Sequence, residues 1–547
     1  MSWYYKLANA SIRLTALLLS VVLLLLLLPS SSMFIMIAAT PLDDYVLKPD
    51  HHYSWHDTGG HVKGWFLDGA WEATVLNLTS QRWLSPEDVD CSIWTHHLLI
   101  VKPAALEHWR TMLFVIGDHT NLDLPPKQTD ELLLLAASVA VRTKSLAMIL
   151  YQIPNQPCHF KDDTAESQHS EDDLIAYTWA QFLKHPDRAE WLAQLPMTKA
   201  VVRAMDAAQS FCAQIFSLQV DSFVVVGASK RGWITWTAAA VDKRVVGIVP
   251  IVMDALSFRH NLHHFYKALG GWPFAFEPYV SFNITAQLDS LGFKQLVAII
   301  DPIVYKERLT MPKLVVTTSN DEFFLLDDSS YFWNELEGEK YLLILSNTDH
   351  SLFTGLPKLL KAVKAFYLSI VSSFQNYKPA LASFIQSSTN LKATSASLSS
   401  MTDRPRYWWS IDRDEGILRV MTADKPYRAR LWYAYNGHWT KKRDFRWFCV
   451  ESGSCGSTIV IKEICFQPIF FFYKNLRPVE LEDALNTTLT YVARIPFPKE
   501  GYGAFYVELE FTGQFFLPYV LTTEAVIIPN TFPYKDCFGV GCRGTLV

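Results

Sequence analysis

The stretch VVVGASKRGWITW, residues 224–236, raises the first question about this chain. Its β-branched start is typical of a buried strand, and an apolar, helix-compatible segment follows Gly232. Between them a sharp turn carries Ser229, two residues after Gly227. Two interpretations are open at this point. Ser229 is either an exposed nucleophile at a strand-to-helix turn or only the N-cap of the helix.

Residues 41 to about 375 alternate between strand-like and helix-like patterns. Most strand-like runs are almost continuously apolar, as in buried parallel strands, and helical segments such as 129–143 and 170–185 lie between them. The alternation predicts an α/β fold with helices on both faces of a mainly parallel sheet. The predicted strands are 96–104, 111–118, 146–154, 222–229, 245–254, 313–321 and 340–350.

The pattern changes after residues 380–400, which are rich in Ser and Thr and have no strong period. Short strand-like runs separated by turn residues then continue to the end, which predicts a small β-sandwich of about seven strands. The predicted organisation is a signal segment at 1–39, an α/β domain at 40–378, a linker at 379–400 and a β-sandwich at 401–547.

The bulk composition narrows the class of protein. Of the 547 residues, 50% are hydrophobic and only 19% are charged, so extensive disorder is excluded. The formal net charge is −5 and no basic block is present, which argues against a nucleic-acid partner. Aromatic residues make up 14% of the chain, including 18 Trp. Most aromatic side chains pack in cores, and a surface that faces a sugar or peptide is the less common role.

The N-terminus predicts export. Lys6 and Arg13 precede the Leu-rich residues 15–29, and a positive start before an apolar core is typical of a secretory signal. The alternative is an uncleaved anchor, because the apolar residues 33–39 extend the segment toward membrane-spanning length. We therefore expect a secreted protein, with membrane anchoring as the alternative.

Glycosylation and cysteine patterns fit export. Asn77, Asn283 and Asn486 begin N-glycosylation triplets. Three cysteines lie before residue 400 and five after it, so full pairing needs a bridge between the halves, and otherwise at least two thiols stay free. The eight cysteines are Cys91, Cys158, Cys212, Cys449, Cys455, Cys465, Cys537 and Cys542.

Three reactive residues each follow a predicted strand: Ser229, Asp321 and His350. Ligands bind outside the carboxyl ends of strands in open parallel sheets, so these ends can bring the three side chains together. The order Ser, acid, His is that of α/β-hydrolases, in which imidazole takes the serine proton and the carboxylate orients the imidazole. Rival acids are Asp254, Asp327 and Asp328.

Each of these residues also has a structural interpretation. Ser229 and Asp321 are both favoured N-cap residues, and a lone histidine such as His350 is most often a hydrogen-bonded loop residue. The three together, in hydrolase order and each at a strand end, favour a catalytic triad in an α/β-hydrolase fold.

An oxyanion hole needs two N–H donors near the serine. The backbone of Lys230 is one candidate, and the loop after the third strand offers Gly117 or Asp118 as the other. The turn departs from the G-x-S-x-G pattern because Arg231 stands two residues after the serine and Gly232 arrives one position later.

The sequence predicts neither a metal nor a cofactor. The histidine doublets at 51–52, 96–97 and 263–264 lack a zinc-binding pattern, and no Walker or dinucleotide-binding loop is present. The aromatic and His-rich residues 255–300 predict a lid over the substrate pocket.

Several long motifs resemble the PhoPQ-activated pathogenicity-related protein family, which includes bacterial exported proteins and eukaryotic autocrine proliferation repressor proteins. The resemblance covers nearly the whole chain after residue 40. The motifs are GASKRGWITWTAAAVDKRVVGIVPIVMD, YQIPNQP, EDDLIAYTW, LPMTKAVVRAMDA, NDEFFLLDDSSYFW, GEKYLLILSNTDHSL and RDFRWF.

The resemblance implies an α/β-hydrolase domain followed by a β-rich domain, with Ser229, Asp321 and His350 at the family's triad positions. The loop IGDHTN has fewer glycines than expected, which leaves the second oxyanion donor open. Two functions are expected: a secreted serine hydrolase acting on an ester or peptide, or a secreted signalling or binding protein on a hydrolase scaffold. The expected partners are a small-molecule or peptide substrate and a protein partner or receptor.

Overall fold

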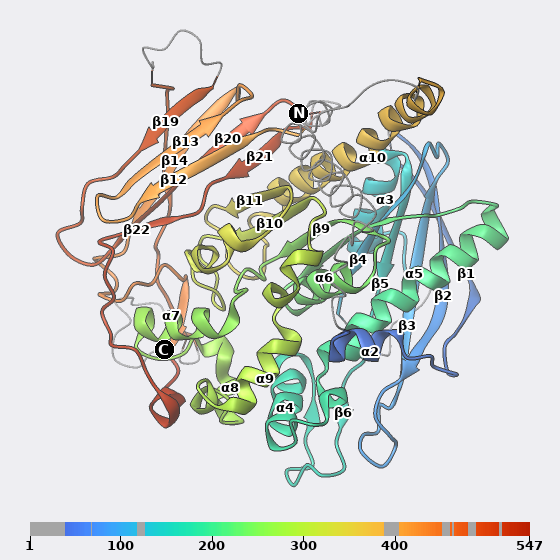
Figure 1. The fold of residues 1–547 in the computed structure, drawn as a ribbon, viewed down its shortest axis with the longest axis horizontal. Coiled ribbons are helices and arrows are strands. Elements are labelled where there is room, and N and C mark those ends of the chain that lie inside the picture. The colour runs from blue at the N-terminus through green and yellow to red at the C-terminus, as the bar shows by residue number, and fades with distance from the viewer. Residues whose placement is uncertain are drawn as a thin grey trace, which may run out of the picture. The chain divides into compact units, whose positions relative to one another are not determined.

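A single continuous sheet organises the chain in the computed structural model (Figure 1). Its hydrolase-like part has the strand order β1-β2-β3-β5-β4-β8-β9-β10-β11. Neighbours are parallel from β5 to β11 and antiparallel from β1 to β5. The structure describes residues 39–66, 68–117, 126–387, 404–450, 460–461, 464–479, 488–513 and 517–547.

The seven strands predicted from apolar runs are all present, and the fold class is an α/β-hydrolase fold with further C-terminal sheets. In this sheet, β1 and β2 were missed. Strand β1 is mostly exposed and carries polar and glycine residues, and polar residues such as Glu72 and Asn77 interrupt the buried residues of β2. The bounds are β1 (Ser54–Phe66), β2 (Gly69–Arg82), β3 (Ile93–Pro103), β4 (His108–Val115), β5 (Ser145–Leu150), β8 (Phe223–Ala228), β9 (Val245–Ile251), β10 (Lys313–Thr318) and β11 (Lys340–Leu345).

Helices cover both faces of this sheet, as predicted. Helices α3 and α10 contribute to the core on one face, and α5 and α6 to the core on the other. Residues of β8 alternate between the two cores, as expected for a strand buried on both sides. The bounds are α2 (Pro41–Leu47), α3 (Glu131–Thr143), α4 (Glu171–Lys184), α5 (Gln194–Phe216), α6 (Lys230–Val241) and α10 (Leu356–Ser387), with short β6 (Cys158–His159) and β7 (Gln168–His169) before α4.

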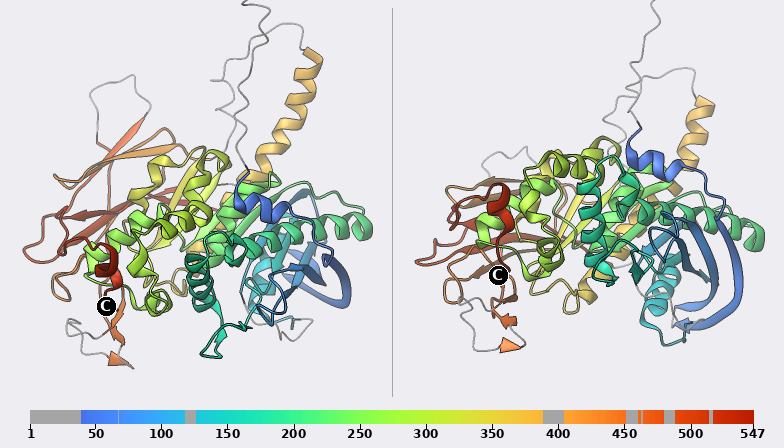
Figure 2. Two further views of the ribbon diagram at one scale, coloured as in Figure 1. Left: turned by 60° about the horizontal axis from the view of Figure 1, so that its bottom comes forward. Right: turned by 90° about the horizontal axis from the view of Figure 1, so that it is seen from below.

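The segment predicted as a lid is a helical insertion between β9 and β10. It contains α7 (Phe258–Leu269), α8 (Glu277–Ser281) and α9 (Leu291–Ile300). Trp272 of this insertion exchanges backbone hydrogen bonds with Thr545 and Val547 near the end of the chain. Both views in Figure 2 accordingly show the red C-terminal segment beside the green α7.

Most C-terminal strands form two facing antiparallel layers, and β15, β16 and β17 form a separate three-stranded sheet. One layer is β12-β13-β19, and the other is β21-β20-β14-β18, with β22 pairing β20. Residues of both layers, such as Val420 of β13 and Val507 of β20, are buried in one common core. The bounds are β12 (Tyr407–Asp412), β13 (Ile417–Thr422), β14 (Arg428–Tyr435), β15 (Phe448–Val450), β16 (Val460–Ile461), β17 (Ile464–Phe466), β18 (Phe472–Asn475), β19 (Leu489–Ala493), β20 (Gly503–Phe511), β21 (Tyr519–Thr522) and β22 (Val526–Ile528).

The second layer continues the hydrolase sheet. Strand β21 lies antiparallel to β11, with Thr522 opposite Leu342, and residues 41–547 form one compact unit. Helix α10 runs into the range predicted as a linker and ends at residue 387, and residues 388–403 lie outside the described part. The domain boundary at 379–400 stays a prediction about where the chain can be cut.

Two disulfide bonds lie among the described residues. Cys91 pairs with Cys158, and Cys537 pairs with Cys542, so neither bond joins the two halves of the chain. Cys212 and Cys449 are buried free thiols, which matches the expectation that at least two thiols stay unpaired.

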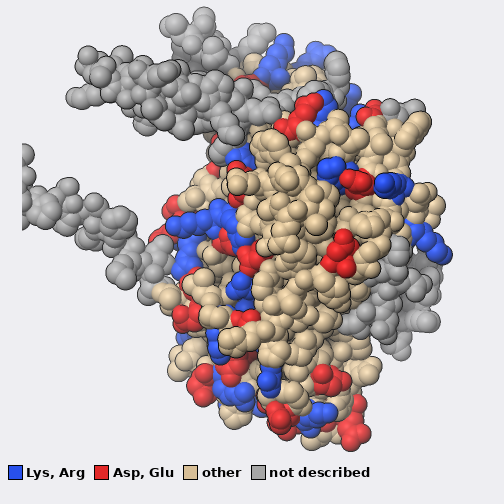
Figure 3. All heavy atoms as spheres, turned by 90° about the vertical axis from the view of Figure 1, so that its right-hand side faces the viewer, with Lys and Arg blue, Asp and Glu red and all other residues tan. Residues whose placement is uncertain are grey.

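The surface carries charges of both signs. Figure 3 shows Lys and Arg interspersed with Asp and Glu around a broad uncharged area on one face. Exposed ion pairs such as Lys144–Glu107 contribute little to stability because water and salt screen them. Within the described residues, no helix combines the length and the apolar character needed to cross a membrane.

Candidate active site

Ser229 occupies a sharp turn between β8 and α6. Its φ is 56° and its ψ is −128°, a costly conformation for a residue other than glycine. The turn is held by hydrogen bonds: the Ser229 N–H donates to the Ile251 carbonyl, and the Ser229 carbonyl accepts from Trp233. A strained serine between a strand and a helix is the geometry of a nucleophile turn and not of an ordinary N-cap, and no capping bond from its side chain is present.

Gly232, which stands one position later than the second glycine of the G-x-S-x-G pattern, is required for steric reasons. A Cβ on Gly232 would lie 2.9 Å from the Met253 Cβ and 3.0 Å from the Ile251 carbonyl oxygen. Glycine at this position therefore lets α6 approach the neighbouring strand β9. A Cβ on Gly227 would likewise lie 2.4 Å from the Arg231 carbonyl oxygen. The two glycines relieve crowding on either side of the serine, although their spacing differs from the usual elbow.

The structure brings Ser229, His350 and Asp321 together. The His350 Nε2 atom lies 3.0 Å from the Ser229 Oγ atom. On the opposite side of the ring, Nδ1 lies 2.9 Å from each carboxylate oxygen of Asp321. When the Nδ1–H group donates a hydrogen bond to the Asp321 carboxylate, Nε2 is unprotonated and can accept the hydroxyl proton of the serine.

Asp321 is fixed from several directions. Its Oδ1 atom accepts the N–H groups of Phe323 at 2.8 Å and Phe324 at 3.0 Å, and its Oδ2 atom accepts the Thr318 hydroxyl at 3.2 Å. Its side chain is almost fully buried. Asp321 therefore accepts backbone N–H groups, as an N-cap residue does, and also contacts His350.

The charge balance favours a basic imidazole. Burial disfavours the charged ring, but the Asp321 carboxylate outweighs this effect and holds the pKa of His350 above its ordinary value. The nearby Lys230 ammonium acts in the opposite direction. The Phe323 ring packs on the imidazole at a centroid distance of 4.4 Å and limits its motion.

A second carboxyl group supports the histidine loop and was missed in the sequence. Glu322 accepts the backbone N–H of His350 at 2.9 Å. Burial and the adjacent Asp321 charge raise the pKa of Glu322 to about 7. Its position directly after Asp321 was the available signal, but proximity in sequence did not reveal that it turns toward the histidine backbone.

The rival acids have other partners. Asp254 is fully buried and accepts the Thr317 hydroxyl, and burial raises its pKa to about 8, with the Asp321 charge as a further cause. Asp328 accepts the Leu325 N–H, and burial also raises its pKa. Asp327 binds His264 and Arg443. Among these four aspartates, the hydrogen bonds of the described residues join only Asp321 to His350.

Both basic residues after the serine are held by carboxylates. The Lys230 Nζ atom lies 2.8 Å from Glu171 and 2.8 Å from Asp172. The Arg231 guanidinium binds Glu171 with two nitrogens, at 2.7 and 2.6 Å. Burial opposes ionisation of Glu171, but the two cations hold its pKa well below the ordinary value. The sequence motif EDDLIAYTW contained both acids, yet nothing in it revealed this role.

Arg231 also links the serine turn to the loop after β4. Its Nε atom donates to the Ile153 carbonyl at 2.5 Å, and its guanidinium lies against Gly117, where an added Cβ would be 2.3 Å from Nη2. Gly117 thus contacts the Arg231 side chain, and its part in an oxyanion hole stays a prediction. Asp118, the other candidate, lies outside the described residues.

The C-terminal part holds both loops that carry the acid and the base. Next to the acid, the Asn320 amide donates to the carbonyls of Phe445 and Ile469, at 2.8 and 3.1 Å. Near the base, Asn347 exchanges two hydrogen bonds with the Phe471 backbone, at 2.9 and 2.7 Å. The C-terminal strands therefore help to position Asp321 and His350, a role the sequence did not indicate.

The helical insertion reaches the same region. The Tyr279 hydroxyl donates to Asp172 at 3.1 Å, beside Lys230. The Phe276 ring lies 6.4 Å from the Phe323 ring, which in turn packs on His350. The insertion thus borders the triad, and its role as a lid stays a prediction.

The remaining predicted sites lie apart from the triad. Asn283 is exposed with φ of 57°, Asn77 is half-buried within β2, and Asn486 lies outside the described residues. In the described part, one group of residues has the types and spacing of metal ligands: His263, Cys537 and Cys542. The two sulfurs, however, form a disulfide bond. A disulfide does not offer the thiolates that a zinc site needs.

Comparison with solved structures found similar chains among bacterial esterases. An acetyl xylan esterase from Paenibacillus sp. R4 is 17% identical, with a TM-score of 0.38 over 59% of this chain and 92% of that chain. Acetyl xylan esterase 1 from Thermoanaerobacterium sp. JW/SL YS485 is 14% identical, with a TM-score of 0.39 over 60% of this chain and 93% of that chain.

Sequence comparison gives a closer relationship. The chain is 33% identical over 519 residues to autocrine proliferation repressor protein A of Dictyostelium discoideum, covering 92% of this chain and 93% of the relative. The model of the PhoPQ-activated pathogenicity-related protein family matches residues 42–399. This match spans the whole region that carries the serine turn, the acid and the histidine, and the chain therefore belongs to the PhoPQ-activated pathogenicity-related protein family.

Proposed function

We propose that this protein is a secreted serine hydrolase that cleaves an ester or peptide bond through an acyl-enzyme. The observation that carries the proposal is the continuous hydrogen-bond path from Asp321 through His350 to Ser229. A serine hydroxyl is a poor nucleophile until an adjacent base removes its proton, and this path supplies an oriented base.

In the proposed reaction, the Ser229 Oγ atom attacks the carbonyl carbon while His350 Nε2 takes the hydroxyl proton. The resulting oxyanion is stabilised by the Lys230 N–H and by the backbone after β4 near Gly117. His350 then gives the proton to the leaving alcohol or amine, and the acyl group stays on the serine oxygen. Water activated by His350 repeats the sequence and releases the acid.

The positive charge of Lys230 adds to this environment. Its ammonium is close enough to oppose protonation of His350 and is itself held by Glu171 and Asp172. In this geometry Lys230 acts as a fixed charge beside the nucleophile and not as a mobile base.

Export is part of the proposal. The Lys6 and Arg13 start before an apolar segment supports a cleaved signal. The Cys91–Cys158 and Cys537–Cys542 bonds support an oxidising compartment. In a eukaryotic host, the protein should reach the medium without the residues before about Thr40. Recovery only in membranes, with an intact N-terminus, would support the anchor instead.

A second function is favoured by one specific observation. The Dictyostelium relative is named an autocrine proliferation repressor, so a secreted signalling protein on a hydrolase scaffold is the alternative. A protein of this kind needs a receptor and does not need turnover.

One experiment separates the two functions. Purified protein is treated with a fluorophosphonate probe, and the labelled residue is located by mass spectrometry. We expect labelling at Ser229, no labelling of Ser229→Ala, and hydrolysis of simple esters by the wild type only. Folded wild-type protein that neither labels nor hydrolyses esters or peptides would contradict the hydrolase. Growth repression by Ser229→Ala at the wild-type level would support the signalling function.

A further inference from the structure

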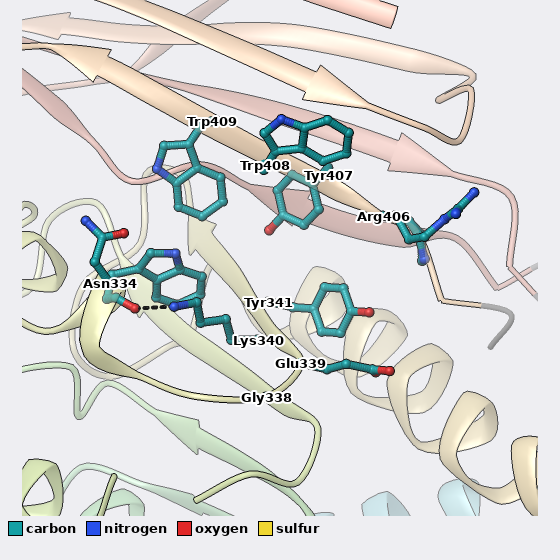
Figure 4. Close-up of a pocket in the computed structure, with 11 residues that line it drawn as sticks. Asn334, Gly338, Glu339, Lys340, Tyr341, Arg406, Tyr407, Trp408 and Trp409 are labelled. Atoms are coloured by element: carbon teal, nitrogen blue, oxygen red, sulfur yellow. Dashed lines mark hydrogen bonds between the residues drawn. The ribbon is translucent and has the colours of Figure 1, made fainter. Parts of the chain in front are cut away.

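A second cleft lies where β12 faces the start of β11 (Figure 4). Its volume is about 480 Å³, within the range of sites that bind small organic molecules. Five aromatic side chains line it: Trp333, Tyr341, Tyr407, Trp408 and Trp409. In Figure 4, the side chains of β12 lie above the cleft and those of residues 339–341 lie below it.

The aromatic wall is built from two stacked pairs. Trp333 and Trp409 are 5.4 Å apart between ring centroids and 27° from parallel. Tyr341 and Tyr407 are 6.3 Å apart and 16° from parallel. Each pair joins one ring from the hydrolase part to one ring from β12, so the wall crosses the seam between the two parts.

Hydrogen bonds hold these rings in place. The Trp409 indole N–H donates to Glu524 at 2.8 Å, and the Tyr407 hydroxyl donates to the Thr522 carbonyl at 2.9 Å. The Lys340 ammonium donates to the Trp333 and Leu336 carbonyls. A wall fixed in this way loses little conformational entropy when a ligand binds.

Trp408 differs from its neighbours. Trp408 is 46% exposed, whereas the other four aromatic residues of the cleft are buried or half-buried. Because successive side chains of a strand point to opposite faces, Trp408 borders the cleft from the solvent-facing side of β12, and Tyr407 and Trp409 point the other way. An exposed indole beside a preformed aromatic wall is a typical feature of a binding site.

Polar groups border the same cleft. Asn334 is exposed, Glu339 has a side chain 40% exposed, and Arg406 has a side chain 59% exposed. They place an amide, a carboxylate and a guanidinium at the rim, so hydrogen-bond donors and acceptors are both available. An apolar wall with such a rim suits a ligand that is apolar on one face and carries hydroxyl groups at its edge.

The local charges argue against a cationic ligand. Aromatic cages bind quaternary ammonium groups, but this cleft is bordered by the Lys340 ammonium, which two carbonyl groups hold, and by Arg406, which lies 3.4 Å from Asp424. Its one lining carboxylate, Glu339, is already paired with Arg404 at 2.6 Å. A polyhydroxylated ring fits this balance better, because its C–H face packs on indole and its hydroxyl groups bond the rim.

The cleft is separate from the triad. Lys340 and Tyr341 lie at the start of β11, whereas His350 follows the end of this strand. Six strand residues span roughly 17 Å, so the cleft and the nucleophile lie at opposite edges of the sheet. A ligand in the cleft therefore does not occupy the proposed catalytic site.

We propose that this aromatic cleft is a non-catalytic carbohydrate-binding site that holds a pyranose-containing oligosaccharide along its mouth, with one sugar ring packed on the exposed Trp408 indole. The site attaches the protein to glycan while the triad at the other edge stays open. The proposal does not depend on hydrolysis, because none of the cleft residues takes part in the triad.

The test uses the purified full chain and four probes: cellopentaose, xylopentaose, chitopentaose and pentagalacturonic acid. Binding is followed by calorimetry and by tryptophan fluorescence. We expect at least one probe to bind, and Trp408→Ala to weaken that binding about tenfold or more, since a tryptophan anchor is commonly worth over 1.4 kcal/mol. Arg406→Ala should weaken it by a smaller factor.

Matched variants make the result specific. Trp109→Ala removes another half-exposed indole outside the cleft and should leave binding unchanged. Ser229→Ala should bind as the wild type does, so a failed hydrolase and a failed glycan site are distinguishable. The proposal is overturned if no probe binds, or if binding survives Trp408→Ala. Binding of tetramethylammonium or of a peptide at Trp408 in place of all four sugars would also overturn it.

Discussion

Two histidine–aspartate pairs lie near the carboxyl ends of the strands. They differ in the contact that the second ring nitrogen of the histidine makes. His350 contacts Asp321 at 2.9 Å, and His264 contacts Asp327 at 3.0 Å. The two aspartates stand only six residues apart in one loop after β10. The bond lengths alone therefore do not separate a catalytic pair from a structural one.

The surroundings separate them. The second ring nitrogen of His350 reaches the Ser229 hydroxyl, and the side chain is 17% exposed. The His264 side chain is 1% exposed, and its Nδ1 atom has no hydrogen-bond partner among the described residues. Asp327 turns its other oxygen to Arg443 from the C-terminal part. One pair is placed to serve the proposed proton transfer from Ser229, and the other joins α7, the loop and the C-terminal strands.

Identical changes at the two histidines should give the largest difference in activity. His350→Gln removes the only proposed base for Ser229, and turnover should fall by about 10⁵ or more. His264→Gln keeps an N–H that can donate to Asp327, so turnover should stay within a few-fold of the wild type. Ester hydrolysis and fluorophosphonate labelling measure both. Equal loss of activity in the two variants would show that the pairs are not functionally distinct.

The two aspartates give the next largest effect. Asp321→Asn should lower turnover by about 10⁴, because the amide favours the wrong tautomer of His350, while the fold is retained. Asp327→Asn should leave turnover nearly unchanged but lower the free energy of unfolding by about 3–5 kcal/mol, because Arg443 stays buried without its anion.

Chemical denaturation and steady-state hydrolysis of both variants check this pair of outcomes. The comparison fails if Asp327→Asn loses turnover and keeps its stability, since the acid of the triad would then be misassigned.

Much of the candidate site could be predicted from the sequence. The strand ends alone placed Ser229, Asp321 and His350 together, because strand periodicity and hydrolase order are local and linear signals. The sequence also favoured Asp321, which directly follows the strand and lies at the family's triad position, but Asp327 stayed a rival because both lie in one short acidic loop.

Other parts could not be predicted because they depend on contacts between distant segments. Glu171 meets Arg231 across 60 residues, and Asn320 meets Phe445 across 125 residues. Nor did the pattern show that β21 continues the hydrolase sheet, since strand pairing between domains leaves no period in the sequence. The predicted separation into an α/β part and a β part holds for element types, but the sheet itself runs through both.

The smallest expected effect concerns Asp254, a buried aspartate whose pKa shift is opposite to that of Asp327. Burial would raise the pKa of Asp327, but Arg443 and His264 hold it well below the ordinary value. Burial raises the pKa of Asp254 to about 8, and the Asp321 charge adds to the effect, while no ion pair of Asp254 occurs among the described residues. Asp254 is therefore protonated in the folded protein at neutral pH.

This proton gives a definite sign to the pH dependence of stability. The unfolded chain releases the Asp254 proton near pH 4, whereas the folded protein keeps it to about pH 8. The folded state binds more protons between these values, so this residue makes the protein less stable as pH rises through that window. Asp327 acts in the opposite direction: its contribution is present at neutral pH and is lost as pH falls below about 4.

Asp254→Asn replaces a neutral acid by a neutral amide of the same shape, and the amide oxygen can still accept the Thr317 hydroxyl. We expect the variant to match the wild type near pH 4 and to exceed its free energy of unfolding by on the order of 1–3 kcal/mol near pH 8. Turnover should stay within a few-fold, because Asp254 makes no described hydrogen bond to His350. Urea titrations at several pH values measure the difference. An unchanged pH slope would mean that Asp254 is ionised in the fold, and a large loss of turnover would make Asp254, not Asp321, the orienting acid.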